Sequence, residues 1–433
     1  MKTKNVTGLI LLACWAGAQA QDLGSIYQDA LANDAQYRAA KAQYASIEER
    51  VPQSRAALRP VISLSAGGNR NDANGTGLSA QQYTSKSYSV SLTQPLFRRQ
   101  SVIGLDQSNL LLEQARAQLE QARQELLIRT AQAYFDVLLA RDSLNTIKTQ
   151  RAANLELSAQ AKRSFEIGTV SITDVRDAKA RYDIVTAQEI SASNDLSSKI
   201  LTLRQIINKD PGTLAPLRAG LTLQNPVPND MQAWVDKALT SNAGVLAAAA
   251  AAEVARLETK KARAAHLPTL DLTASKGFER SGSVTTIDNN VYSKAIGVQL
   301  TVPIYSGGGT VAHEREMLAL MEKSEAELEG ARRIGTLTAQ QAYLGVTAGL
   351  AQVQALEESV SSGRTALDAN KRGLEVGTRI NIDVLNAQQQ LAVTERDLAK
   401  ARYDTLMSQL KLKAAAGSVG ESDVMELGQL LIR

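Results

Sequence analysis

An internal duplication constrains this chain more than any other feature of its 433 residues. Through the first part of each copy, matching residues recur 208 positions apart, so that Pro60 returns as Pro268. One residue is then inserted and the offset becomes 209, so that Gly168 returns as Gly377. A period of this length indicates two similar structural repeats, although length alone would suggest two or three unrelated domains.

The duplication predicts how the chain is divided. The prolines between the copies (Pro211, Pro216, Pro226 and Pro228) indicate a connecting segment. The expected division is a signal peptide (1–20), a first repeat (21–210), a Pro-rich connection (211–231), a second repeat (232–416) and a C-terminal tail (417–433).

The first twenty residues have the pattern of a secretory signal peptide. Lys2 and Lys4 precede an apolar run, and Ala18-Gln19-Ala20 forms a small-residue cleavage site. The chain's one cysteine, Cys14, lies inside this segment, so the exported chain is expected to have no disulfide and no Cys-ligated metal. Lipidation of Cys14 is the less favoured alternative, because Leu12 fits a lipoprotein motif poorly.

Charge and hydropathy exclude two classes of protein. Removal of the signal peptide lowers the net charge from +4 to about +2, without the clustered basic residues that nucleic-acid binding requires. The exported part has no apolar run near the ~18 residues of a membrane-spanning helix. We therefore expect neither a nucleic-acid-binding protein nor a helical membrane protein.

Each repeat begins with a helical stretch (22–58 or 232–266) and continues into two alternating segments. Tyr88, Val90 and Leu92 alternate with serines and a threonine, as in a half-buried hairpin or a lipid-facing barrel strand. Alternation by itself does not separate these two alternatives. The expected strand pairs are 61–68 with 84–95 and 269–277 with 291–303, joined by polar loops at 67–82 and 277–290.

The remainder of each repeat has helical periodicity. Leu105, Leu112 and Leu119 fall seven residues apart, which indicates long coiled-coil helices. A single helix over 102–166 would measure roughly 95–100 Å at 1.5 Å per residue, and Gly168 and Gly377 would mark the tips of antiparallel helical hairpins. The second copy has additional glycines, which weaken the expectation that its long helix is equally regular (Gly330, Gly335, Gly345, Gly349, Gly363 and Gly373).

Four strands are too few for a closed barrel in a membrane. The smallest such barrels have about eight strands, and an open edge in lipid leaves backbone groups unpaired. Transmembrane strands would therefore require several chains: two would supply eight strands and three would supply twelve. Strand arithmetic predicts an oligomer but not its size.

With the duplication, strands and hairpins established, the chain resembles the TolC family of outer-membrane efflux and secretion channels. The resemblance covers essentially all of the exported chain and is most specific in four segments. These are His266–Leu272 (HLPTLDL), Pro303–Gly308 (PIYSGG), and the tips Ile167–Val175 (IGTVSITDV) and Val376–Val384 (VGTRINIDV).

This resemblance implies a mainly α fold with membrane β-strands. A homotrimer would form a 12-stranded barrel in outer-membrane lipid, four strands per chain, continued by an α-helical tunnel in the periplasm. It would bind no cofactor and act as the exit duct for tripartite drug efflux, type I protein secretion or both. Its partners would be a periplasmic adaptor (membrane fusion) protein and an inner-membrane efflux pump or ABC exporter.

The resemblance also assigns residues at the tips. The adaptor would dock at Gly168, Thr169, Gly377 and Thr378, and the periplasmic gate would be formed by Thr173, Asp174, Arg379 and Asp383. Two positions depart from the family pattern. Asn386 stands where close relatives carry a second aspartate, and Leu374 stands where they can have a gate tyrosine, so a second acidic ring and one gate hydrogen bond are in question.

Physical chemistry allows two interpretations of these gate residues. Symmetry would repeat Asp383 around a constriction, where a carboxylate ring attracts cations, and an Arg379 fork could bind Asp174. Alternatively, Asp174 and Asp383 are helix caps that follow tight turns. Spacing alone favours the caps, the family resemblance favours the gate, and both roles can coexist.

Enzymatic interpretations lack the necessary residues. His313 is followed by Glu314, but no second histidine completes a zinc motif, and the Gly307–Thr310 run lacks the lysine of a phosphate-binding loop. The sequence therefore predicts no enzyme. The alternatives to a channel are a periplasmic adaptor and an exported structural coiled coil.

Overall fold

The computed structural model describes residues 21–75, 78–218, 220–221, 223–281 and 289–431. The expected signal peptide, with Cys14, lies outside these ranges. The chain forms two compact units, and each draws on both repeats. We call them the hairpin unit (Met1–Arg38, Ala122–Asn242 and Thr336–Arg433) and the sheet unit (Ala39–Gln121 and Ala243–Gly335).

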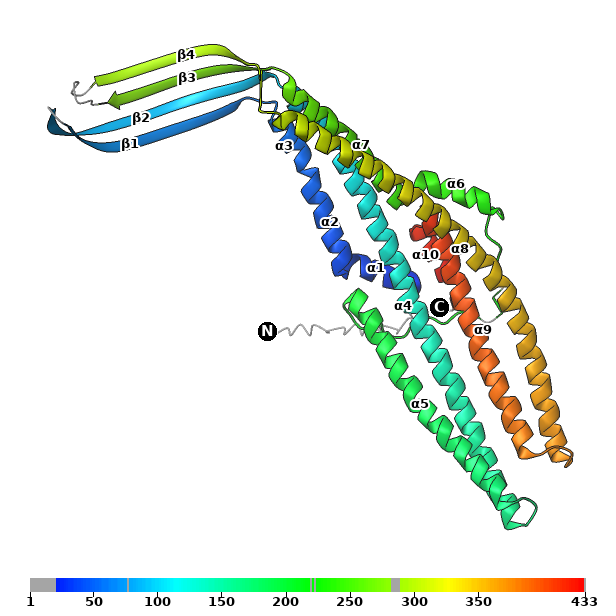
Figure 1. The fold of residues 1–433 in the computed structure, drawn as a ribbon. Helices are drawn as coiled ribbons and strands as arrows, with labels where there is room; N and C mark the ends of the chain where they lie inside the picture. The colour runs from blue at the N-terminus through cyan, green and yellow to red at the C-terminus, as the bar shows by residue number, and fades with distance from the viewer. Residues whose placement is uncertain (1–20, 76–77, 219, 222, 282–288, 432–433) are drawn as a thin grey trace, which may run out of the picture. The chain divides into compact units, whose positions relative to one another are not determined.

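Helices make up the hairpin unit, in which α5 folds back along the C-terminal part of α4 and α9 folds back along that of α8 (Figure 1). Its elements are α1 (Leu23–Asn33), the end of α4 (Arg99–Glu166), α5 (Ile172–Ile207), α6 (Met231–Ser241), the end of α8 (Gly309–Glu375), α9 (Asn381–Ala415) and α10 (Glu421–Gln429).

The sheet unit joins four strands to shorter helical segments. It contains most of α2 (Ala35–Glu48), α3 (Arg50–Ala56), β1 (Val61–Gly75), β2 (Leu78–Phe97), the start of α4, α7 (Ala243–Arg263), η1 (Ala264–His266), β3 (Thr269–Ser281), β4 (Asn289–Thr301) and the start of α8.

The helical stretches expected over 22–58 and 232–266 are interrupted. In the first repeat the chain leaves helical geometry at Asp34, with ψ of 126°, and in the second at Asn242, also with ψ of 126°. Asp34 accepts a hydrogen bond from the backbone N–H of Tyr37 at 2.7 Å, which satisfies a donor at the start of the next helix. A short polar side chain thus ends one helix and starts another without a proline.

The core of the hairpin unit lies where α1, α4, α5, α9 and α10 meet. Tyr134 is fully buried, and its hydroxyl donates to the carbonyl of Ala215 at 2.9 Å. The segment expected as a C-terminal tail forms α10 and buries Val424 and Leu427 in this core. Asp423 accepts from the N–H of Gly420 at 2.7 Å, which caps α10.

A pair formed by half-buried Asp142 and buried Tyr403 joins α4 to α9 in the hairpin unit. The Tyr403 hydroxyl donates to Asp142 Oδ2 at 2.7 Å. Burial raises the pKa of Asp142 above its ordinary value of 3.8, although the bond from Tyr403 and the charge of Arg141 act in the opposite direction. An acid with a raised pKa in the folded state contributes stability at low pH and loses it as pH rises.

We therefore expect Asp142→Asn to raise the melting temperature at pH 7 by a few degrees, because the amide still accepts from Tyr403 without a buried charge. The gain should shrink as the pH falls toward the ordinary aspartate pKa of 3.8, because the wild-type carboxyl then becomes protonated. Tyr403→Phe should lower the melting temperature at pH 7. Thermal unfolding of the three proteins between pH 4 and 8 tests this, and a gain that does not change with pH would contradict it.

The additional glycines of the second copy do not interrupt its long helix. Helix α8 runs unbroken over 67 residues, nearly matching the 68 residues of α4. The glycines instead permit close packing: a Cβ on Gly349 would lie 2.5 Å from Thr405 Oγ1 of α9, and one on Gly345 would lie 3.3 Å from Ser408 Oγ. Packing along the helix interface therefore outweighs the low helix propensity of glycine.

The four strands form one antiparallel sheet in the order β1-β2-β3-β4 (Figure 1). The strands of the first pair extend beyond the expected 61–68 and 84–95, and β3 continues to Ser281. Pairing continues through positions such as Asn69↔Ser85, where neither residue is apolar. Alternation of hydrophobicity therefore could not indicate this part of the strands. Conversely, β4 ends at Thr301, before Pro303, which cannot donate a ladder hydrogen bond.

The two faces of this sheet differ in chemistry. One face carries large apolar side chains exposed in the single chain, including Leu64 (73% exposed) and Ile296 (79% exposed). The opposite face carries serines, and Ser63 and Ser65 hydrogen-bond across to Ser91 and Ser89 at 2.7 and 2.8 Å. An exposed apolar face of this kind indicates contact with lipid or with another protein.

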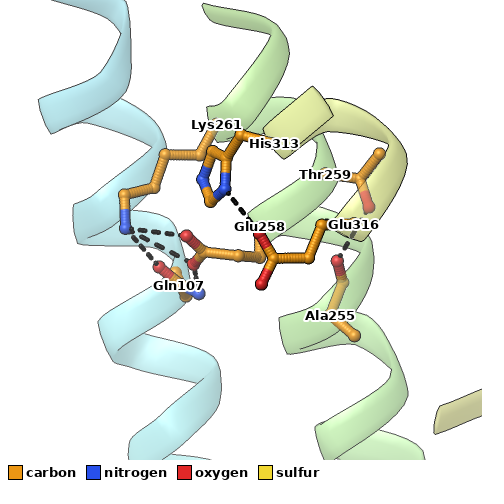
Figure 2. A network of polar contacts seen from close by, with 7 residues as sticks. All are labelled: Gln107, Ala255, Glu258, Thr259, Lys261, His313 and Glu316. Atoms are coloured by element: carbon orange, nitrogen blue, oxygen red, sulfur yellow. Dashed lines mark hydrogen bonds and ion pairs between the residues drawn. The ribbon is translucent and has the colours of Figure 1, made fainter. Parts of the chain in front are cut away.

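Polar contacts tie α4, α7 and α8 together in the sheet unit. Figure 2 shows Lys261 of α7 reaching Gln107 of α4 at 3.4 Å and Glu258 at 3.2 Å, while Gln107 also donates to Glu258. Thr259 donates to the carbonyl of Met317 in α8 at 3.1 Å. These bonds connect segments of the two repeats.

Among the described residues, no single helix is both long and apolar enough to cross a membrane; α6 and α7 pass that test only when they are taken together.

Candidate functional site

The first hairpin tip is a tight turn that ends α4. Gly168 has a φ of +77°, a left-handed conformation that favours glycine. Its N–H donates to the carbonyl of Phe165 at 2.9 Å, and the N–H of Thr169 donates to Ser164 at 2.9 Å. These two bonds define a Schellman motif, and the Thr169 hydroxyl also donates to the Ser164 carbonyl at 2.9 Å.

The second tip repeats this geometry at the end of α8. Gly377 has a φ of +79°, and its N–H donates to Leu374 at 3.1 Å. The N–H and hydroxyl of Thr378 donate to the carbonyl of Gly373 at 2.8 and 3.2 Å. Each glycine and threonine assigned to adaptor docking therefore has a defined part in its turn, and both threonines are exposed.

Asp174 acts as a helix cap after the first tip. Ser171 accepts from the N–H of Thr173 at 3.0 Å, and Asp174 Oδ2 accepts in return from the N–H of Ser171 at 3.0 Å. This reciprocal arrangement is a capping box that starts α5. Thr173 and Asp174 are both exposed.

The second tip has only half of this cap. Asp383 Oδ2 accepts from the N–H of Ile380 at 3.4 Å, but Ile380 has no side-chain oxygen with which to return the bond. Arg379 Nη1 lies 3.8 Å from Asp383 Oδ2, so this arginine pairs with the acid one turn along its own hairpin. The link from Arg379 to Asp174 considered from the sequence is therefore not the pairing found within the chain.

Sequence reasoning missed Arg181, which connects the two hairpins. Its Nη2 donates to Asn386 Oδ1 at 3.0 Å, and its Nη1 donates to Gln389 Oε1 at 3.3 Å. The position that departs from the family pattern thus has a polar partner on α5. Asn386 was visible as a departure, but only the packing of α5 beside α9 identifies the arginine that contacts it.

The residues considered for a zinc motif and a phosphate-binding loop have structural roles. His313 lies 3.1 Å from Glu316 (Figure 2), and Gly307 and Gly308 have φ of +63° and +81° in the turn before α8. Within the described ranges, no group of three or more His, Cys, Asp or Glu side chains is placed to hold a metal ion.

Comparison with known proteins supports one family. The profile of the family described as "Outer membrane efflux protein" matches residues 26–209 and 234–418, which together cover most of both repeats. The chain belongs to this family. It is 33% identical to the outer membrane protein TolC of Vibrio cholerae over 423 residues, covering 97% of this chain and 95% of the relative.

Two further comparisons agree. The alkaline protease secretion protein AprF of Pseudomonas aeruginosa is 33% identical, with 96% of this chain and 89% of the relative covered. The solved structure of the CmeC outer membrane channel of Campylobacter jejuni shares the fold, with a TM-score of 0.81, 17% identity and coverage of 98% and 93%.

Membership of the TolC family confirms the main expectations. The chain is an outer-membrane efflux or secretion channel protein, and it is not an enzyme. Its fold is mostly helical, with long helical hairpins and one four-stranded antiparallel sheet. A periplasmic adaptor and an exported structural coiled coil are thereby excluded, and the family's tripartite assemblies are the setting in which it works.

Proposed function

We propose that three copies of this TolC-family chain close a 12-stranded barrel and serve as the exit duct of a tripartite system. The observation that carries the proposal is the open sheet. Along their described lengths, β1 and β4 each pair on one side only, and the apolar face between them is exposed in the single chain. An unpaired strand edge in lipid is costly, so strands of further copies are needed to close the sheet.

The serine-bearing face would then line the barrel and the apolar face would contact lipid, as in other outer-membrane barrels. The cargo would be drugs, secreted proteins or both. Support for both classes comes from the family's description as outer membrane efflux proteins and from the alkaline protease secretion protein AprF, which is 33% identical to this chain.

The tips would bind the periplasmic adaptor that joins the duct to an inner-membrane pump or ABC exporter. The residues before the two tip glycines, Ile167 and Val376, are 77% and 74% exposed. Large apolar side chains held outward by a rigid turn are suited to protein contact. The docking surface would include Gly168, Thr169, Gly377 and Thr378 beside them.

The gate would be formed by Thr173, Asp174, Arg379 and Asp383 of each copy. Three-fold symmetry would repeat the Arg379–Asp383 pair around the constriction, where the carboxylates favour cations. Capping and gating are compatible, because each Asp383 oxygen can accept more than one hydrogen bond.

Conductance in planar bilayers tests the channel and its gate. Asparagine caps helices about as well as aspartate, so Asp383→Asn removes the charge while keeping the cap. We expect small cation-selective steps from wild type, a several-fold loss of cation preference in Asp383→Asn, and larger steps in Arg379→Ala. Asp404→Asn, an exposed acid farther along α9, is the matched control and should behave as wild type.

Absence of steps from every protein, despite confirmed insertion, would contradict the channel proposal. Equal selectivity in wild type and Asp383→Asn would leave the channel but remove Asp383 from the constriction. Loss of the oligomer in Arg379→Ala would show that this residue is structural.

A further inference from the structure

Two lysines lie directly opposite each other on the apolar face of the sheet. Lys276 of β3 is the register partner of Lys294 of β4, and Lys276 is also paired with Val90 of β2. Val90 is in turn paired with Leu64 of β1. Because cross-strand partners share a face, both ammonium groups belong to the same face as these aliphatic side chains.

An aromatic row lies next to this lysine pair, two residues nearer the strand ends at Gly75 and Ser281. Tyr88, Phe278 and Tyr292 are register partners across β2, β3 and β4. Their ring centroids are 5.0 Å apart at each step. Aromatic residues in such a row are typical of the level at which a barrel wall meets lipid headgroups.

A second basic row lies on the other side of the aromatic row. Lys86 of β2 is paired with Arg280 of β3, again on the apolar face. Val90, the register partner of Lys276, lies four positions along the strand from Lys86, which is about 14 Å at ~3.4 Å per residue. Basic side chains therefore bracket the aromatic row from above and below.

The rows on the helical side of the lysine pair are mostly apolar. Leu92, Ala274 and Ile296 form the next row, and Gln94, Leu272 and Val298 form the row beyond it. Ile296 and Val298 are 79% and 61% exposed in the single chain. This surface is suited to acyl chains, whereas a soluble anion would gain nothing from it.

The lysine pair is costly unless an anion accompanies it. Like charges directly opposite on a sheet repel, and cations on the lipid face of a barrel destabilise it in a depth-dependent way. In the part of the chain that the structure describes, no ion pair is found for Lys86, Lys276 or Lys294. An acid on a neighbouring strand would have been the simplest compensation, but the face provides Val90 beside Lys276.

We propose that this surface binds the phosphorylated headgroup of a glycolipid of the lipid A class. Phosphates at the two ends of a disaccharide headgroup could meet the two basic rows, the sugars would lie over the aromatic row, and the acyl chains would cover the apolar rows. Lysine stems can lie along apolar surface while their charged ends reach phosphate. The site rests on the proposed barrel, because it requires the apolar face to contact lipid.

Lipid binding to the purified oligomer in neutral phosphatidylcholine nanodiscs tests the site. The probes are diphosphorylated lipid A and the same lipid with its phosphates removed. We expect Lys276→Gln/Lys294→Gln to bind the diphosphorylated lipid at least tenfold more weakly than wild type. Lys276→Arg/Lys294→Arg should retain binding, and Lys260→Gln/Lys323→Gln, on exposed helical positions of the same unit, should match wild type.

Several outcomes would overturn the proposal. These are equal affinity of wild type and the glutamine variant, equal affinity of wild type for both lipids, and displacement of the lipid by millimolar inorganic phosphate, which would indicate a site for the free anion. Conductance of the same preparations separates this test from the channel proposal. If the glutamine variant conducts and binds the lipid as wild type does, only the lipid site is overturned. Failure of wild type to conduct would instead count against the barrel.

Discussion

Gly417→Ala is expected to prevent stable folding of the hairpin unit. A Cβ at this position would lie 2.0 Å from the carbonyl oxygen of Ser241, 2.5 Å from its carbonyl carbon and 3.1 Å from the backbone nitrogen of Asn242. These are backbone atoms at the end of α6, so no side-chain rotation can relieve the clash. Gly417 also has a φ of +66°, which costs other residues about 1–2 kcal/mol.

The position matters because Gly417 ends α9 and leads into α10. Its N–H donates to Ala414 at 2.9 Å, and the next residue, Ser418, returns a bond to Lys413 at 2.9 Å. If this turn moved away from α6, the segment that follows it would be displaced, and Val419 and Val424 of that segment would leave the core. We therefore expect the free energy of unfolding to fall by more than ~4 kcal/mol, which is at the upper end for single substitutions.

Gly420→Ala is a control three residues away. A Cβ there would have Ser422 Oγ at 3.8 Å as its nearest atom, an ordinary contact. The amount of assembled protein in the membrane and its melting temperature should be near wild type for Gly420→Ala and strongly reduced for Gly417→Ala. Normal assembly and melting of Gly417→Ala would show that α6 and α9 do not approach as closely as described.

Gly377→Pro is expected to abolish transport while the barrel remains in the membrane. Proline holds φ near −65°, whereas Gly377 requires +79°. Proline also lacks the N–H that Gly377 donates to Leu374 at 3.1 Å. The second tip would lose its Schellman motif, and with it the fixed direction of Val376 and Thr378 on the proposed docking surface.

Drug resistance in an efflux-dependent strain measures this coupling. Gly377→Pro should lower resistance to the level of a strain without the channel, while membrane insertion and oligomer formation continue. Gly377→Asn is the matched control, since asparagine tolerates the left-handed conformation, and it should keep most of the resistance. Unchanged resistance in Gly377→Pro would contradict a docking role for this tip.

Much of the fold could be predicted because its signals are local or periodic. Alternation at Tyr88, Val90 and Leu92 predicted strands, since successive side chains of a strand point to opposite faces. The seven-residue spacing of apolar residues predicted long helices, since residues three or four positions apart lie on the same face of a helix. The tip glycines were predictable because a left-handed turn favours one residue type. The duplication then placed the same elements in both halves of the chain.

The site could be predicted only in part. Both tips were located, and the capping alternative for Asp174 is the arrangement observed within the chain. The partner of Asn386 was not predicted, because Arg181 lies 205 residues away and no spacing rule connects them. The gate and docking roles depend on neighbouring copies and partners, and remain predictions.

Spacing and alternation along the chain were sufficient for the strand faces, the long helices and the hairpin tips, because each depends on residues a few positions apart. The constant offset between matching residues was sufficient for the repeats. Tertiary structure decided the rest. It kept α8 regular through close packing of Gly349 against Thr405, brought the C-terminal α10 into the core, and set Lys276 opposite Lys294. These features arise from contacts between segments distant in sequence, whose energies depend on which surfaces meet.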